Sequence, residues 1–196
     1  MLENHKVYLE RKKLYKSFGY DIDKERDFVL EAAMPLSGKI LEAGTGKGHF
    51  ALALAKRGYS FVTFDISEEE QRFAKLNIAY NGLEKQVDFR IKDGEHTGFF
   101  DASFDVVLSV NVLHHLANPY RVIDELIRVL ATGGKLVISD FSKMGFRVMD
   151  KIHAIDGKAH EAGKVSLLDA EKYLSNKGFL IKKTKSAHQH VVVATR

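Results

Sequence analysis

The stretch of the 196-residue chain most suited to chemistry is residues 39–50, where Gly44, Gly46 and Gly48 stand at alternate positions. The stretch opens as a short apolar strand that carries Glu42, and a helical pattern follows the glycines directly. Glycine allows positive φ angles and close approach of a ligand to the backbone. The start of a helix presents free N–H groups. This order of elements predicts a ligand-binding turn.

Two common ligand classes fit this turn poorly. A phosphate-binding P-loop requires G-x-x-x-x-G-K-[ST]. Here Gly48 occupies the position of the Ser or Thr, and Leu41 occupies the position of the first glycine. A dinucleotide fingerprint requires a small third residue, and His49 is too large for that position. The remaining pattern, E-x-G-x-G-x-G from Glu42, resembles motif I of the class I S-adenosylmethionine-dependent methyltransferases.

The rest of the chain alternates apolar strand patterns with amphipathic helix patterns. Strands are expected at residues 39–43, 60–65, 87–93, 104–110 and 135–140, with helices at 49–57, 67–80, 118–131 and 166–177. Strands joined by crossover helices form a parallel sheet with right-handed connections. Residues 179–185 and 190–195 are expected to pair as antiparallel strands because only a short turn joins them.

Carboxylates stand where several of these strands end. Glu42, Asp65 and Asp93 lie at the ends of the first three strands, and the segment 109–111 lies at the end of the fourth. Ligands of open α/β sheets bind beyond these ends. Apart from Lys47 no basic residue is expected beside the turn, so a phosphate would be repelled. A cationic ligand with hydroxyl and amine groups, such as S-adenosylmethionine, fits this charge pattern better.

The resemblance extends over residues 36–140 and the terminal hairpin. Segments 104–116 and 128–138 are similar to motifs of the small-molecule and quinone-type branch of the family. The resemblance implies an α/β, three-layer Rossmann-like fold. Its seven-stranded sheet would be mostly parallel, with one antiparallel strand and the order 3-2-1-4-5-7-6.

The resemblance also implies roles for single residues. Asp65 would contact the ribose hydroxyls, Asp93 the adenine amine, and Ser109 and Asn111 the methionine part of the cofactor. The cofactor would be S-adenosyl-L-methionine and its product S-adenosyl-L-homocysteine. The residues expected to bind it are Glu42, Ala43, Gly44, Thr45, Gly46, Gly48, Asp65, Ile66, Asp93, Gly94, Glu95, Ser109 and Asn111.

The catalytic residues are less clearly indicated than the cofactor site. In-line methyl transfer depends on alignment of the reactants, and a base is needed only when the acceptor must lose a proton. His114 and His115 are the candidates for that base, and no His–carboxylate spacing resembles a metal site. Residues 118–120, Asn-Pro-Tyr, are similar to the [DN]-P-P-[YF] motif of amino methyltransferases, but a helix N-cap explains them better.

The chain is expected to form a single domain, residues 1–196, in which the two helices of residues 1–34 could form a lid. Residues 141–165 show no long period and are interpreted as an insertion near the acceptor site. With 45% hydrophobic and 29% charged residues, no cysteine and no apolar run of 18 residues, the composition predicts a cytoplasmic protein without disulfides or thiolate zinc sites. The sequence indicates no oligomeric state.

A small-molecule acceptor is the favoured interpretation. The net charge of +4 and the basic first helix leave RNA open, and protein is also open as an acceptor. A protein that binds S-adenosylmethionine without turnover is a further alternative. A nicotinamide-dependent oxidoreductase is less consistent with His49 and with the terminal hairpin.

Overall fold

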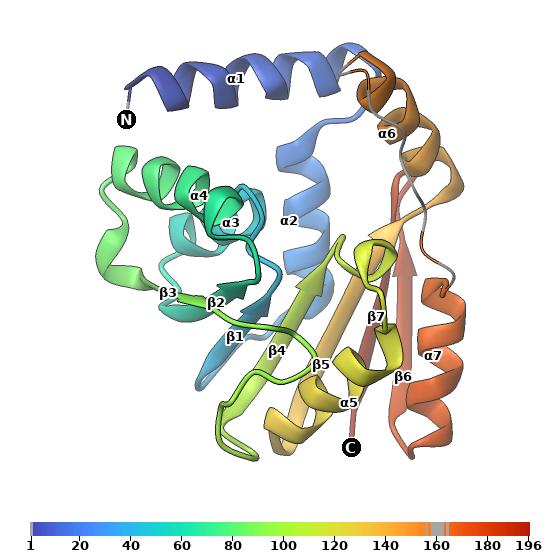
Figure 1. Ribbon diagram of the computed structural model, residues 1–196. Helices are drawn as coiled ribbons and strands as arrows, with labels where there is room; N and C mark the ends of the chain where they lie inside the picture. The colour runs from blue at the N-terminus through green and yellow to red at the C-terminus, as the bar shows by residue number, and fades with distance from the viewer. Residues whose placement is uncertain (1, 156, 158–162, 164) are drawn as a thin grey trace.

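The computed structural model describes residues 2–155, 157, 163 and 165–196, and its centre is a seven-stranded sheet (Figure 1). The strand order β3-β2-β1-β4-β5-β7-β6 confirms the predicted topology. β1 to β5 pair in parallel, whereas β7 runs antiparallel to both β5 and β6. The strands are β1 (Ile40–Ala43), β2 (Phe61–Asp65), β3 (Val87–Ile91), β4 (Phe104–Val110), β5 (Leu130–Phe141), β6 (Leu180–Lys185) and β7 (Gln189–Thr195).

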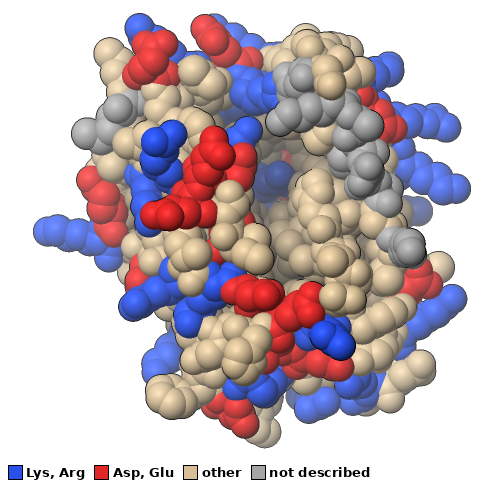
Figure 2. Space-filling view, in the orientation of Figure 1, with Lys and Arg blue, Asp and Glu red and all other residues tan. Residues whose placement is uncertain are grey.

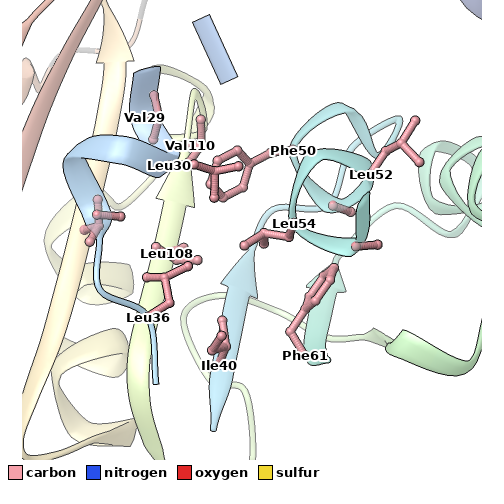
Figure 3. Close-up of a cluster of buried hydrophobic side chains, with 14 of the residues drawn as sticks. Val29, Leu30, Leu36, Ile40, Phe50, Leu52, Leu54, Phe61, Leu108 and Val110 are labelled. Atoms are coloured by element: carbon pink, nitrogen blue, oxygen red, sulfur yellow. The ribbon is translucent and has the colours of Figure 1, made fainter. Parts of the chain in front are cut away.

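Helices cover both faces of the sheet and complete the three layers. The α-helices are α1 (Leu2–Ser17), α2 (Ile22–Ala33), α3 (His49–Lys56), α4 (Glu68–Tyr80), α5 (Pro119–Val129), α6 (Lys143–Ile155) and α7 (Leu167–Asn176). Short 3₁₀ turns occupy Glu84–Gln86 and Leu113–His115. α2, α3 and α4 contribute to one apolar cluster (Figure 3), and α5 and α7 contribute to another. None of the described helices is long and apolar enough to cross a membrane.

The central strand β4 is buried on both faces, as its nearly continuous apolar sequence predicts. Successive side chains of a strand point to opposite faces of the sheet. Leu108 therefore packs in the cluster with α2 and α3, while Val107 packs in the cluster with α5 and α7. Both side chains are fully buried. This strand holds the segment that follows it, residues 111–117, firmly at the carboxyl edge of the sheet.

Polar caps start the helices where the sequence indicates. Asp21 caps α2 and Ser67 caps α4, each by accepting a hydrogen bond from a backbone N–H three residues later. Ser166 and Asp169 form a reciprocal capping box at α7. Such caps stabilise a helix by about 0.5–2 kcal/mol. They also fix where each helix begins relative to the strand before it.

Two predictions about the second half of the chain are wrong. β5 begins at Leu130 rather than at residue 135, because Leu130 pairs with Phe104 before a register shift in β4. Residues 143–155 form α6, although 141–165 was interpreted as aperiodic. The helical spacing of apolar residues covers only a short segment: Val148, Met149 and Ile152 are buried beside Tyr20 and Ile22. Most of the remaining part of that segment lies outside the described residues.

α1 lies across the carboxyl edge of the sheet and reaches from α4 to α6 (Figure 1). The Asn4 side-chain amide donates to Asn77 Oδ1 of α4 at 2.8 Å, and the His5 ring stacks on Tyr80 with centroids 3.7 Å apart. Within α1, Tyr8 is the buried side chain. The helix is therefore attached near its start by polar and aromatic contacts, and near its end by Leu14 and Tyr15, which pack against the cluster that contains Tyr20.

Candidate functional site

A cavity of about 700 Å³ opens at the carboxyl ends of β1, β2 and β4. Figure 2 shows a hollow on this side of the molecule, with acidic side chains along part of its rim. The predicted cofactor residues that line the cavity are Glu42, Ala43, Gly44, Thr45, Gly46, Asp65, Ile66, Asp93, Gly94, Glu95, Ser109 and Asn111. Residues from four separate strand ends therefore meet at one site.

The glycine turn has positive φ angles at Gly44 and Gly46, and the space beside Gly46 is open. A Cβ atom at Gly44 would lie 2.3 Å from Val112 Cγ2, so no side chain fits there. Gly48 does not line the cavity. A Cβ atom at Gly48 would lie 2.7 Å from Ala74 Cβ, so this glycine allows α3 to pack against α4. Its part in the site is to position the turn.

Asp65 is held at the end of β2 by the turn that it faces. Its Oδ2 accepts from the Gly46 N–H at 2.7 Å, and its Oδ1 accepts from the Ser67 N–H at 2.9 Å. A carboxylate has about four acceptor positions, so both oxygens keep capacity for hydroxyl donors of a ligand. The two hydrogen bonds from the backbone fix the orientation of the carboxylate, and with it the direction of its remaining acceptor positions.

Glu42 differs from the other acidic residues because it is almost completely buried. Its side chain, 1% exposed, accepts from Thr63 Oγ1 at 2.6 Å, and the Thr63 and Thr45 hydroxyls are also 2.6 Å apart. Burial, and then the neighbouring charge of Asp65, raise the pKa of Glu42 to about 8. At neutral pH the carboxyl is therefore mostly protonated in the free protein.

Basic residues also reach this cavity, which corrects the expectation that Lys47 stands alone there. Arg26 of α2 and Lys92 both line it. Arg26 is 9% exposed, its Nη1 donates to the Tyr20 hydroxyl at 3.3 Å, and its Nε is buried without a partner among the described residues. With the Asn111 amide oxygen turned toward Arg26, that oxygen accepts from both Nη atoms at 2.9–3.0 Å.

The sequence held a signal for Arg26 that the motif search missed. Arg26 lies four residues after Ile22 and three before Val29, so it occupies the apolar face of α2. A charged residue on a buried helix face is rare unless it has a partner or a ligand. The unpartnered Nε at the cavity therefore identifies Arg26 as a residue available to an anionic group.

The loop after β3 forms the opposite wall of the cavity. Asp93 Oδ1 accepts from the Glu95 N–H at 2.8 Å, and Glu95 Oε1 accepts from the Asn118 amide at 2.8 Å. Asn118 is the N-cap of α5, with Pro119 first in the helix, as the sequence indicates. Its side chain makes no cap bond and instead ties α5 to the loop that carries Asp93.

The two candidate histidines have different surroundings. His115 lines the cavity, whereas His114 is 4% exposed and does not. His114 Nδ1 lies 2.6 Å from Asp140 Oδ1, and the His114 backbone N–H donates to Asp140 Oδ2 at 3.2 Å. The two imidazole centroids are 4.0 Å apart. Among the described residues no cluster of three or more His, Asp or Glu could hold a metal ion.

Fold and site together define a class I methyltransferase domain. Residues 41–138 match the family described as "Methyltransferase domain", and the chain belongs to this S-adenosylmethionine-dependent family. The fit to the cofactor is visible in the residues themselves. The carboxylates of Asp65, Asp93 and Glu95 line the cavity and can accept from hydroxyl and amine groups, and Arg26 offers an unused N–H.

The names of curated relatives refer to the methylation of small molecules. A ubiquinone biosynthesis O-methyltransferase of Dechloromonas aromatica is 31% identical over 126 residues, which cover 63% of this chain and 53% of the relative. A 27-O-demethylrifamycin SV methyltransferase of Amycolatopsis mediterranei is 33% identical over 57% of this chain and 42% of the relative. The chain spans about half the length of these relatives.

Solved structures share the fold over most of the chain. A putative S-adenosyl-L-methionine-dependent methyltransferase of Methanococcus maripaludis has a TM-score of 0.72 at 16% identity, covering 98% of this chain and 91% of that one. Magnesium protoporphyrin IX methyltransferase of Synechocystis, solved with bound SAH, has a TM-score of 0.65 at 22% identity and covers 89% of this chain and 81% of that one. At these identities the likeness concerns the fold.

Proposed function

We propose that the protein transfers a methyl group from S-adenosylmethionine to a small molecule by in-line displacement. The observation that carries the proposal is the single cavity in which the motif I turn, Asp65, Asp93 and Arg26 meet. Its volume of about 700 Å³ lies within the usual range of roughly 300–1,000 Å³ for ligand pockets. The names of the relatives support a small-molecule acceptor.

Different residues of the cavity would bind different parts of the cofactor. Asp65 would accept from the ribose hydroxyls, and the Asp93–Glu95 loop would hold the adenine, as the family resemblance implies. Arg26 would bind the carboxylate of the methionine part, because its buried Nε is unused and a guanidinium suits a carboxylate. Ser109 and Asn111 would lie beside the same part. When bound, the cofactor supplies an activated methyl group on a sulfonium.

The protein's contribution to the chemistry is then alignment and, for a hydroxyl acceptor, removal of one proton. The bond from the nucleophile to the methyl carbon forms as the sulfur–carbon bond breaks, leaving neutral S-adenosylhomocysteine. His115 lines the cavity and would take the acceptor's proton. His114, bonded to Asp140 and in ring contact with His115 at an interplanar angle of 49°, would hold that imidazole in position.

The single domain spanning residues 1–196, the lid formed by its first two helices and the cytoplasmic location remain predictions. α1 crosses the carboxyl edge of the sheet and Arg26 of α2 lines the cavity, so both helices are suitably located for a lid. The basic residues of α1 are weaker support for an RNA acceptor than their number in the sequence indicates. Lys12 and Lys16 are paired with Asp23 and Asp21, which reduces the free positive charge of that helix.

Thermal unfolding with S-adenosylmethionine, S-adenosylhomocysteine, NAD or no ligand tests the cofactor. At 100-fold over the dissociation constant, binding adds about 2.7 kcal/mol, or on the order of 5–11 °C for a domain of this size. A shift with the two sulfur ligands alone supports the proposal, and a shift with NAD alone contradicts it. Transfer of a labelled methyl group to a small-molecule panel then separates an enzyme from a protein that only binds.

A further inference from the structure

A second cavity, of about 290 Å³, lies between α1, α4 and the start of α3. Lys47 and His49 line both this cavity and the cofactor cavity, so the two adjoin at the glycine turn. Nothing in the proposed binding of the cofactor uses the second space. Its chemistry can therefore be considered separately.

The two cavities differ in the charge of their walls, although Arg26, Lys47 and Lys92 also line the cofactor cavity. Five acidic residues line the cofactor cavity: Glu42, Asp65, Glu70, Asp93 and Glu95. Arg11 and Lys47 line the second cavity, and no acidic residue is among the described side chains that do so. Glu70 approaches Lys47 from the cofactor side, at 3.9 Å between charged atoms. Because Lys47 keeps a half-exposed side chain, this pair neutralises it only weakly.

His49, which lines both cavities, contains a polar atom that makes no hydrogen bond to a described residue. Its Nδ1 is buried and has no hydrogen-bond partner among the described residues. Burial, and then the charges of Arg26, Lys47, Lys12 and Arg11, lower the pKa of His49 to about 3. The imidazole therefore stays neutral, and the basic groups around it, of which Lys12 is paired with Asp23, create a positive potential there. A buried polar atom without a partner is costly, and a ligand would remove that cost.

The remaining walls are aromatic and apolar. The ring of Tyr8 stacks on His49 with centroids 5.0 Å apart, and His5 continues the stack to Tyr80. Val7 and Phe73 supply apolar surface. A ligand with a flat or apolar body thus has a surface to pack on, while its charged end can meet Arg11 and Lys47.

We propose that this second cavity binds the carboxylate or phosphate group of a small organic anion with an apolar or aromatic body. Resting on the proposed function, the anion is the methyl acceptor, whose reactive end extends past Lys47 and His49 toward the cofactor. The protein would then select acidic acceptors over neutral ones. Carboxylate and phosphate share the chemistry that Arg and Lys recognise.

Calorimetric titration tests the binding site directly. Protein saturated with S-adenosylhomocysteine, and free protein in parallel, are titrated with benzoate, phenyl phosphate and the neutral analogue benzamide. Both anions are expected to bind at least about tenfold more tightly than benzamide, since only they pair with the basic groups. The relative affinity of benzoate and phenyl phosphate distinguishes the two anion types.

Arg11→Glu and Lys13→Glu form a matched pair of charge reversals on α1. Arg11 lines the cavity, whereas Lys13 is exposed and does not line it. We expect Arg11→Glu to weaken binding of the anions by about tenfold or more and Lys13→Glu by less than about twofold. Both variants should keep the affinity for S-adenosylhomocysteine. That result would show that α1 and the cofactor site remain folded.

Equal affinity for benzoate and benzamide, or equal losses in the two variants, would overturn the proposed site. If S-adenosylhomocysteine fails to bind, the proposed function fails, while the titration of free protein still decides the anion site. In a turnover panel of paired carboxylate and amide acceptors, the acid should be preferred through a lower KM. A neutral acceptor with equal kcat/KM would overturn the assignment of the anion as acceptor.

Discussion

His114 Nδ1 and Asp140 Oδ1 are 2.6 Å apart in a part of the molecule that is almost closed to solvent. They are 26 residues apart in sequence but meet because β4 and β5 are neighbours: Asp140 lies near the carboxyl end of β5, and His114 lies in the turn after β4. Asp140 also accepts from the backbone N–H groups of His114 and Phe141. The carboxylate therefore fixes the imidazole of His114, against which the ring of His115 lies tilted.

Replacement of His115 tests whether the histidine pair supports catalysis. We expect His115→Ala to lower kcat by about 10²–10⁴-fold on a hydroxyl acceptor, the usual contribution of a general base. Asp140→Asn should lower kcat less and should alter the pH–rate profile, because it changes how His114 is held. Steady-state kinetics from pH 6 to 9 would measure both effects.

The cofactor affinity provides the control for these two variants. His115→Ala should bind S-adenosylhomocysteine as the parent protein does, because catalysis and cofactor binding use different residues. A variant with unchanged kcat and an unchanged pH profile would remove His115 from the mechanism. A variant that loses kcat only through unfolding would reveal itself by its lower melting temperature.

Arg26 is predicted to bind the carboxylate of the methionine part of the cofactor. Arg26→Ala should weaken binding of S-adenosylhomocysteine by about 1.5–3 kcal/mol, the usual contribution of a hydrogen bond to a charged group. 5′-Methylthioadenosine, which lacks the amino-acid part, is the matched ligand and should bind both proteins alike. Titration calorimetry gives both affinities, and an equal loss for both ligands would contradict the assignment.

Asp65 is predicted to bind the ribose hydroxyls. Asp65→Ala should weaken S-adenosylmethionine by roughly 1.5–3 kcal/mol, because a charged acceptor is lost. The Asp65 carboxylate also orders the turn through Gly46 and Ser67, so a 2′-deoxy analogue of the cofactor serves as control. The loss caused by the substitution should be smaller for that analogue. An unchanged affinity for the normal cofactor would refute the ribose role.

Much of the fold was predictable because it depends on local patterns. The apolar run of β4, the caps at Ser67 and Ser166 and the short turn before β7 each determine one element independently of distant contacts. α6 was missed because its few buried apolar side chains, Val148, Met149 and Ile152, lie among charged residues and after Gly145. The early start of β5 depends on pairing with Phe104, which no local pattern encodes.

The site was predictable to the extent that it follows strand ends. Glu42, Asp65 and Asp93 come directly after apolar runs, so their convergence follows from the parallel sheet. Arg26 comes from a helix before the first strand, and only the packing of α2 brings it to the cavity. The protonation of Glu42 depends on burial by Thr63 and its neighbours, which a sequence does not reveal.

Glu42 should make the stability of the free protein fall as the pH rises. The pKa of this group is raised from 4.5 to about 8 in the folded state, so the folded protein binds the proton more tightly than the unfolded chain. The free energy of unfolding therefore decreases between these two values, by at most about 1.4 kcal/mol per pH unit, and the decrease ends above pH 8. His49, whose pKa is lowered from 6.5 to about 3, contributes an opposite slope only below about pH 7.

Urea unfolding from pH 7 to 9 in the parent protein and in Glu42→Gln measures this effect. The parent should lose stability between pH 7 and 8, and the variant, which cannot ionise, should have a flatter profile and greater stability at pH 8. Because the cofactor is cationic, its binding should favour ionised Glu42, so the parent's affinity for S-adenosylmethionine should increase over the same range. Parallel stability profiles for the two proteins would mean that Glu42 is already ionised at neutral pH.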